Sequence, residues 1–499
     1  MKDTKDTEIL NFIKKLGVKD KSLHVKNIID NERLGEFYVR TDHLSYDYSK
    51  QRITKETLER LLEIPDKINL KKSIADISSG EFLNYTEERT ASHMLYRNLN
   101  NPIETIDLNE IAIQRTKVKV RVEAIKKLLD KRIDTIISIS IGGSRLGSEL
   151  LSEVCANPES KIKVHYCSSY DFQELKNVMS SSDARRTLVI ISSKSFTTKE
   201  VMANAVIAKE WLEDSVGKNF LDQILGISSN SEGMKEFGIK GANQFKILDS
   251  LGGRYSIWSA MSLPAMLDMG WQNFEGFLQG AYAADKHFKE SAWNKNIPVL
   301  MALLNAWNLN GLGINNLGIF SYDYKIRSLT KYLAQMGMES NGKTYNLEGE
   351  KIPFQTSPLI WGGYGPDAQH SVFQWLLQGT DTSSCDFIGI HKKDSPLSSS
   401  YRMLLAQIMA LSIGEDNVDY KFKSVAGNNP VSLLTIQELN PANLGFLLAT
   451  YEHKIFVESQ IYNINPFDQW GVQLGKKLTT RSLKEEGFIK QYFNNEIIS

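Results

Sequence analysis

Cysteine is scarce in this sequence, which has three in 499 residues, at positions 155, 167 and 385, and no C-x-x-C spacing. Such an odd, sparse set argues for a reducing compartment and against a disulfide framework or a zinc site. Histidine is also scarce, with eight residues and no H-E-x-x-H pairing. We therefore expect a cytoplasmic protein without a metal centre.

The sequence also lacks an excess of charge and any long apolar run. Lys plus Arg and Asp plus Glu both number 59, so no global field attracts nucleic acid or a membrane surface. No apolar run approaches the roughly 18 to 20 residues that cross a bilayer. The polar start, Met1 to Asp6, does not resemble a signal peptide. With 41% hydrophobic residues, we expect a soluble globular protein of two or three domains, in which only a local cluster can hold an anion.

A first strand–turn–helix unit is predicted from residue 135. The β-branched run 135–141 predicts a strand, Gly142, Gly143 and Ser144 follow it, and 146–154 has a helical pattern. This order is typical of a parallel sheet. The glycines allow a ligand to approach the backbone, and the helix start offers N–H groups to an anion, although a glycine turn alone is weak evidence.

A second unit carries a denser set of polar residues. Residues 187–191 predict a strand, and a helix follows to about residue 212, with Thr197 and Glu200 as a candidate capping box. Five hydroxyl side chains and Lys194 fall within residues 192–198. They form either an anion cradle suited to a phosphate monoester or a polar loop that only caps the helix. The GxxxxGK[ST] spacing of a Walker loop is absent.

Glu339 stands near the end of an expected helix. Apolar residues at 326, 329, 333 and 336 predict a helix over 324–336, and Asn341–Gly342 is a stop signal because both residue types tolerate positive φ. Backbone carbonyls make the field at a helix end negative, which suits a carboxylate that takes up a proton and returns it. A solvated glutamate near a turn is the alternative. Likewise Arg254, in a glycine-rich turn, is either an ion-pair partner or the fixed cation of a site.

The C-terminal third adds further candidates. His370 precedes an expected helix over 371–378, whose dipole disfavours a charged ring and suits either an acid/base or a capping histidine. Residues 444–456 predict an amphipathic helix that carries Glu452, His453 and Lys454. If residues 469–476 are helical, Gln469 and Lys476 lie two turns apart on one face.

Six motifs, in order, resemble the glucose-6-phosphate isomerase family from about Tyr85 to Lys476. They are Ile141-Gly142-Gly143-Ser144, Ser192–Thr198, Gly252–Ser256, Met338–Lys343, Gln369-His370 and Phe467–Lys476. The resemblance implies an α/β fold with two sugar-isomerase (SIS-type) domains, each a central, mostly parallel sheet flanked by helices. We expect a mainly helical N-terminal segment over 1–105, a first SIS-type domain for phosphate binding over 106–285, a second with the catalytic base and histidine over 286–478, and a helical tail over 479–499.

The same resemblance implies a role for each site residue. Glu339 matches the catalytic base, His370 and Lys476 the ring-opening pair, and Arg254 the cation beside the enediolate. Positions that match the phosphate and sugar contacts are Gly142, Gly143, Ser144, Ser193, Lys194, Ser195, Thr198, Gln335 and Gln469. The family implies a homodimer in which a histidine crosses from the partner to complete each site. Departures from the family pattern, which concern loop shape and sugar selectivity, occur at Arg145, Asp171, Ala334, Pro366, Ala368 and Gln473.

The implied reaction interconverts glucose 6-phosphate and fructose 6-phosphate in glycolysis and gluconeogenesis. One base can move the proton between adjacent carbons, and a guanidinium can stabilise the enediolate without transferring a proton. No net redox change occurs, so neither a nucleotide cofactor nor a metal is expected. A dual glucose/mannose-phosphate isomerase and a sugar-phosphate sensor without turnover are the alternatives, and the presence of Glu339, His370, Arg254 and Lys476 argues against the sensor.

Overall fold

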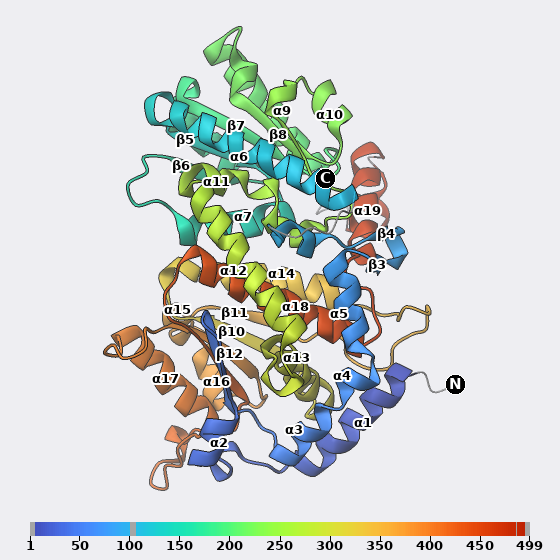
Figure 1. Cartoon of the computed structure of the whole chain (residues 1–499), viewed down its shortest axis with the longest axis vertical. Helices are drawn as coiled ribbons and strands as arrows, with labels where there is room; N and C mark the ends of the chain where they lie inside the picture. Colours follow the sequence, from blue (N-terminus) through green and yellow to red (C-terminus); the bar gives the residue numbers. More distant parts are fainter. Residues whose placement is uncertain (1–4, 100–105, 486, 495–499) are drawn as a thin grey trace.

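The structure, a computed structural model, describes residues 5–99, 106–485 and 487–494. Figure 1 shows two main sheets, one in the upper and one in the lower half of the view, with α12, α14 and α18 between them. Helices cover the faces of both sheets, so the chain has the expected α/β architecture.

The first sheet has five parallel strands in the order β6-β5-β7-β8-β9. Its strands are β5 (Thr135–Ile139), β6 (Lys163–Cys167), β7 (Thr187–Ser192), β8 (Ile224–Ser228) and β9 (Gln244–Lys246). Every residue of β5, β7 and β8 is buried, as expected for β-branched strands covered on both faces. Because the chain moves from β5 to β6 on one side and to β7 on the other, a crevice opens at the carboxyl ends of β5 and β7.

The second sheet has six strands in the order β1-β2-β13-β12-β10-β11. The strands are β1 (Tyr38–Arg40), β2 (Leu44–Lys50), β10 (Asn316–Ser321), β11 (Leu359–Tyr364), β12 (Ser384–Ile390) and β13 (Val431–Ile436). The last four are parallel, whereas β2 joins β13 antiparallel and β1 joins β2 antiparallel. The N-terminal segment therefore extends this sheet as well as contributing helices. A small hairpin of β3 (Leu83–Asn84) and β4 (Arg89–Thr90) is separate.

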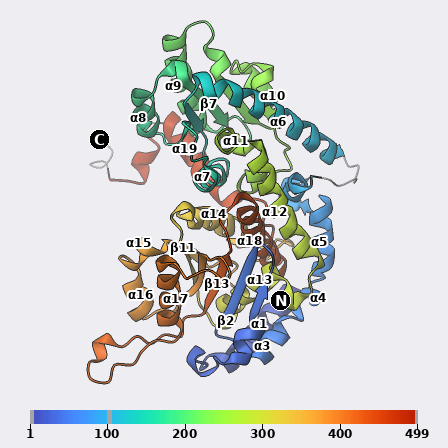
Figure 2. The same cartoon turned by 60° about the vertical axis from the view of Figure 1, so that its left-hand side comes forward.

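Helices occur in every part of the chain, and the domain limits themselves stay a prediction. The N-terminal helices are α1 (Lys5–Asp20), α2 (Asn31–Glu36), α3 (Lys55–Leu61), α4 (Ile64–Lys67) and α5 (Leu70–Ser79). Around the first sheet lie α6 (Ile106–Arg132), α7 (Gly143–Cys155), α8 (Gln173–Ser181), α9 (Lys199–Val216), α10 (Ser231–Glu236) and α11 (Leu263–Met269). Figure 2 gives the side view of α8 to α10 and of the helices that follow: α12 (Trp271–Glu290), α13 (Ile297–Ala306), α14 (Leu329–Asn341), α15 (Gly365–Gln369), α16 (Phe373–Gln378), α17 (Ser399–Ser412), α18 (Pro441–Ile461) and α19 (Gln473–Lys484).

Helix α18 is buried nearly all round, so the amphipathic prediction for residues 444–456 is wrong. Its charged side chains are buried because each has a partner: Glu452 contacts Arg97, His453 Nε2 lies 2.7 Å from Asp285 Oδ1, and Lys454 Nζ lies 2.8 Å from Glu458 Oε1. Trp258 Nε1 also donates to Glu452 at 2.8 Å. These contacts join α18 to α12 and to the 3₁₀ turn Gly253–Trp258, which we call the Arg254 turn.

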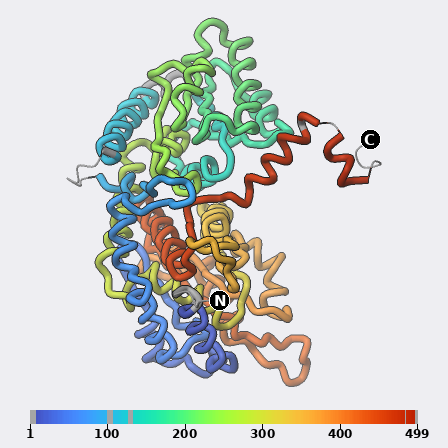
Figure 3. The backbone as a smooth tube through the Cα atoms, turned by 90° about the vertical axis from the view of Figure 1, so that its right-hand side faces the viewer, coloured from blue at the N-terminus to red at the C-terminus, as the bar shows by residue number. Residues whose placement is uncertain are grey.

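Helix α19 stands apart from the body of the molecule, at the right of Figure 3. Residues 471–479 are all exposed, including Leu474 and Leu478, which are 63% and 42% exposed. None of the helices in the described part of the chain combines the length and apolar character that a bilayer crossing requires.

Candidate active site

A cleft opens where the carboxyl ends of β5 and β7 meet the Arg254 turn, the end of α14 and the C-terminal segment. It is lined by every predicted site residue except His370: Gly142, Gly143, Ser144, Ser193, Lys194, Ser195, Thr198, Arg254, Gln335, Glu339, Gln469 and Lys476. These residues come from segments more than 300 positions apart in the sequence. The fold therefore gathers them at the switch point of the first sheet, where open α/β sheets bind ligands.

The hydroxyl-rich loop after β7 forms one end of this cleft. Ser193 Oγ and Thr198 Oγ1 lie 3.0 Å apart, and Ser195 Oγ accepts the Thr197 backbone N–H at 3.3 Å. Helix α9 begins at Lys199 with Thr198 as N-cap and without a side-chain capping bond, so the predicted capping box of Thr197 and Glu200 is wrong. The capping interpretation of the hydroxyls fails with it. The N–H groups that begin α9 are left without a side-chain cap, which favours the anion cradle.

Two cations, Lys194 and Arg89, lie at the same end of the cleft. Lys194 Nζ donates to the backbone carbonyl of Asp249 at 2.7 Å. Burial, and secondly the charge of Arg89, lowers the pKa of Lys194 to about 8. Arg89 contacts Glu87 within the β3–β4 hairpin. Sequence reasoning missed Arg89, because nothing local indicates that this hairpin reaches the cleft.

Glycine is required where two turns of the cleft meet. Helix α7 begins at Gly143, earlier than the predicted residue 146, and a Cβ there would lie 2.4 Å from Gly253 C and Arg254 N. Gly142 has φ +56°, the left-handed region that favours glycine. The Gly142–Ser144 turn therefore packs backbone to backbone against the Arg254 turn.

Arg254 is buried and its guanidinium is held by several acceptors. Nε donates to Ser340 Oγ at 2.7 Å and Nη1 to Gln469 Oε1 at 2.8 Å. Nη2 donates to the carbonyls of Pro466 at 2.5 Å and Asp468 at 3.0 Å. The guanidinium is therefore a fixed positive charge in the wall of the cleft.

Glu339 lies in the last turn of α14, as predicted, but the helix differs in extent. A 3₁₀ turn occupies Tyr324–Ile326, and α14 runs over Leu329–Asn341 instead of 324–336. Gly342 ends it with φ −72°, so no left-handed residue is used; a Cβ there would lie 2.5 Å from the Met338 carbonyl. The Glu339 side chain is 24% exposed, and its Oε2 lies 3.7 Å from Arg254 Nη1. A carboxylate and a fixed cation therefore face the same part of the cleft.

The C-terminal segment brings Gln469 and Lys476 to the cleft without a continuous helix. Gln469 has φ −152°, a 3₁₀ turn covers Trp470–Val472, and α19 starts at Gln473, so the prediction of one shared helical face is wrong. Long-range bonds hold this non-helical backbone in place: Arg254 binds the Pro466 and Asp468 carbonyls, and Lys343 Nζ lies 2.6 Å from Asp468 Oδ1. Local spacing could not reveal these partners.

His370 does not line the cleft of its own chain, and it is exposed. It follows α15, and its backbone N–H donates to the Asp367 carbonyl at 3.1 Å, while α16 begins only at Phe373. The prediction that His370 sits at a helix N-terminus is therefore wrong. Pro366, whose fixed φ suits a first helical turn, starts the short helix before the histidine instead.

Comparison with known proteins identifies the family. The model of the phosphoglucose isomerase family matches residues 47–492. The glucose-6-phosphate isomerases of Acinetobacter baumannii (strain AYE) and Hydrogenovibrio crunogenus are 37% and 36% identical over 93% of this chain, covering 90% and 93% of those proteins. The chain belongs to the phosphoglucose isomerase family. The crystal structure of a glucose-6-phosphate isomerase from Chlamydia trachomatis is similar, with a TM-score of 0.89 and 30% identity over 98% of this chain and 96% of that one.

The phosphoglucose isomerase match covers every residue that lines the cleft, from Arg89 to Lys476. As a member of this family, the chain is an isomerase. In the part of the chain that the structure describes, no group of three or more His, Cys, Asp or Glu side chains is arranged to hold a metal ion.

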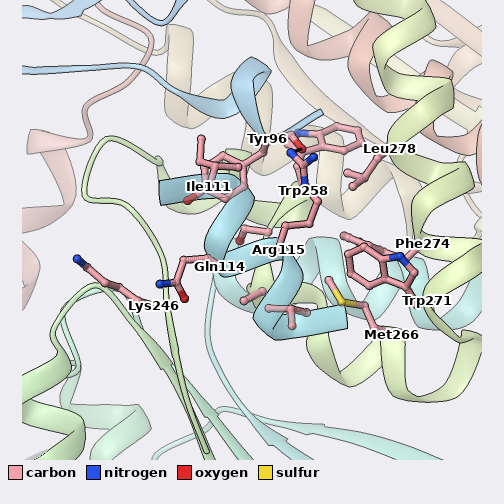
Figure 4. Close-up of a pocket in the computed structure, with 13 residues that line it drawn as sticks. Tyr96, Ile111, Gln114, Arg115, Lys246, Trp258, Met266, Trp271, Phe274 and Leu278 are labelled. Atoms are coloured by element: carbon pink, nitrogen blue, oxygen red, sulfur yellow. Dashed lines mark hydrogen bonds between the residues drawn. The ribbon is translucent and has the colours of Figure 1, made fainter. Parts of the chain in front are cut away.

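A second hollow is lined by Trp258 of the Arg254 turn, and Figure 4 shows its aromatic walls. Trp258, Trp271 and Phe274 contribute rings, with Met266 and Leu278 beside them. It shares no lining residue with the cleft and lacks hydroxyl-rich loops. Within the phosphoglucose isomerase fold, the cleft is therefore the candidate active site.

Proposed function

We propose that this isomerase interconverts glucose 6-phosphate and fructose 6-phosphate through a cis-enediolate, in glycolysis and gluconeogenesis. One observation carries the proposal: the Glu339 carboxylate lies 3.7 Å from the Arg254 guanidinium in a cleft that ends in the hydroxyl-rich loop. A base beside a fixed cation suits proton transfer with a negative intermediate, and the loop suits a phosphate some distance from the reacting carbons.

In this mechanism Glu339 removes the proton from C2 of the aldose and returns it to C1. Negative charge develops on the enediolate oxygens, where Arg254 stabilises it and stays protonated. Both transfers take place on one face of the substrate, so a single carboxylate suffices. The overall reaction is an isomerisation without net redox change, and it requires no nucleotide cofactor.

We propose that the phosphate is bound by Ser144, Ser193, Ser195 and Thr198, with Lys194 beside them. Hydroxyls and backbone N–H groups at a helix start can hold a dianion. Gln335 and Gln469 are proposed to contact the sugar, and Gly142 and Gly143 to let it approach. In support, Gln335 Oε1 is buried and has no hydrogen-bond partner in the described part of the chain, so a sugar hydroxyl can donate to it.

Ring opening needs a proton donor at the ring oxygen and an acceptor at the anomeric hydroxyl. We assign these roles to Lys476 and to the His370 of a second copy of the chain, in a homodimer. The exposure of His370 outside its own cleft supports this assignment. So does the exposed apolar surface of Trp470, Leu474 and Leu478 at the cleft-bearing C-terminal segment, which a second copy can cover.

The cytoplasm is the proposed location. Cys155, Cys167 and Cys385 are all free and buried, which fits a reducing compartment. Sugar phosphates carry charge that keeps them on one side of a membrane.

A coupled assay on fructose 6-phosphate, without added metal, tests the reaction. Wild-type protein is expected to turn over, and Glu339→Gln to lose at least about 10²-fold in kcat, the scale of positioned acid–base catalysis. Glu350→Gln, an exposed glutamate beyond the cleft, is the matched control and should keep wild-type activity. Mannose 6-phosphate is tested in parallel, and equal turnover would widen the substrate range. A wild-type protein that binds fructose 6-phosphate without turnover would contradict the proposal and indicate a sensor.

A further inference from the structure

The donors of Arg254 are almost fully occupied by the protein. A guanidinium carries five N–H groups: one on Nε and two on each Nη. Ser340 Oγ takes the Nε–H, the Pro466 and Asp468 carbonyls face Nη2, and Gln469 Oε1 faces Nη1. One N–H, on Nη1, is therefore left without a hydrogen-bond partner in the described part of the chain.

That Nη1 is also the atom closest to the catalytic carboxylate. Its 3.7 Å separation from Glu339 Oε2 is too long for a hydrogen bond. A shift of less than 1 Å would close this gap, on the scale of hydrogen-bond lengths, and would lock the base in an ion pair. The guanidinium is therefore held close to the Glu339 carboxylate without a hydrogen bond to it.

Ser340, the residue next to Glu339, holds the guanidinium at Nε. It is fully buried, directly follows Glu339 in α14, and accepts the Arg254 Nε–H at 2.7 Å. Its hydroxyl also shares a hydrogen bond of 2.8 Å with Tyr255 OH. The Tyr255 ring is fixed in turn by the rings of His93 and Phe467, with centroids 4.8 and 5.3 Å away.

We propose that Ser340 is a positioning residue that, with Tyr255, keeps the Arg254 guanidinium off Glu339 and leaves its last N–H for the enediolate. The inference rests on the proposed isomerase function. Without the Ser340 hydroxyl, the buried Nε–H loses its acceptor, and the guanidinium is free to turn toward the Glu339 carboxylate, which lies 3.7 Å from Nη1. The base is then neutralised by an ion pair, and the cation is no longer available to the intermediate.

Ser340→Ala tests this role through kinetics and pH dependence. We expect kcat to fall about 10- to 100-fold, the range for loss of an aligned transition-state donor, while KM changes less than about threefold because the phosphate contacts are untouched. The acidic limb of the kcat–pH profile should move to lower pH, because a closer cation disfavours protonation of Glu339. Tyr255→Phe should also lower kcat and move the acidic limb to lower pH, in both cases by less than Ser340→Ala does.

Ser412→Ala is the matched control. Ser412 is also fully buried, and among the described residues its hydroxyl bonds only to the Ile408 carbonyl of its own helix, at 2.6 Å. This variant should keep the wild-type kcat and pH profile even if its melting temperature falls as far as that of Ser340→Ala. If the wild type is active but the acidic limb of the kcat–pH profile does not shift in Ser340→Ala or in Tyr255→Phe, this inference is wrong and the proposed function is unaffected. A wild type without isomerase activity would overturn the proposed function and this inference together.

Discussion

At the scale of single residues, Lys194 combines burial with a ligand-facing position. Burial and the neighbouring Arg89 lower its pKa to about 8, from an ordinary value near 10.5. Lys194 is therefore charged below pH 8 and loses its proton as the pH rises through 8. Inorganic phosphate becomes more fully dianionic as the pH rises over this range, which favours binding, so a fall in its affinity reports the loss of positive charge on the protein.

We predict that phosphate binding weakens as the pH rises from 7 to 9. Loss of the Lys194 charge takes away one cation from the cradle, and we expect about a tenfold fall in affinity over two pH units around its pKa. Lys194→Met should bind phosphate more weakly at pH 7 and show no further fall in affinity to pH 9. Titration calorimetry with inorganic phosphate measures both.

Lys199→Met provides the control for that titration, because Lys199 is exposed and does not line the cleft. It should retain the wild-type pH dependence. If Lys194→Met loses affinity between pH 7 and 9 as steeply as the wild type, Lys194 is not the group that titrates.

At the scale of elements, two turns meet at Gly143. A Cβ at Gly143 would lie 2.4 Å from the backbone of Gly253 and Arg254, whereas a Cβ at Gly253 would meet nothing within 4 Å. Gly143→Ala should therefore displace the Arg254 turn, lower the unfolding free energy by about 1–3 kcal/mol and reduce kcat. Gly253→Ala should leave the urea-unfolding midpoint unchanged. Equal midpoints and equal activities for the two alanine variants would contradict this account of the turn packing.

The elements also show which parts of the site the sequence could predict. Strands β5 and β7 were predictable because long β-branched runs are typical of buried parallel strands, and the motifs after them depend only on local sequence. The end of α14 was predictable near Asn341–Gly342, although Gly342 does not adopt positive φ. Local sequence misplaced the helix starts near Thr197 and His370, because Thr197 bonds Ser195 and Pro366 starts an earlier turn.

Long-range pairing explains the remaining differences. The non-helical backbone before α19 depends on Arg254 and Lys343, which lie more than 100 positions away in the sequence. The polar residues of α18 are buried because Arg97 and Asp285 pair with them from distant segments. Strands β1 and β2 likewise join the second sheet only through β13. None of these partners leaves a periodic or spacing signal near the residues it holds.

At the scale of the whole molecule, the cleft holds every predicted site residue except His370. His370 lies exposed after α15, and the apolar side chains of α19 lie exposed at the C-terminal segment. Both features fit an assembly of two copies in which the His370 of each enters the cleft of the other. Glu339→Gln removes the base from the cleft of the chain that carries it. In such an assembly, His370→Asn instead removes the histidine from the cleft of the partner.

Mixing the two single variants distinguishes these arrangements. Each variant alone should be nearly inactive. If His370 acts in the partner's cleft, a mixed dimer has one site that lacks both groups and one intact site. When equal amounts of the two variants are unfolded and refolded together, half of the dimers are mixed, and each of these has one working site of two. The mixture should therefore recover about a quarter of the wild-type activity. If His370 acts in its own chain, every site in the mixture lacks one group, and no activity returns. Coupled assays before and after mixing, with refolded wild type as the control for refolding yield, separate the two outcomes, and a mixture that stays inactive would contradict the shared-site dimer.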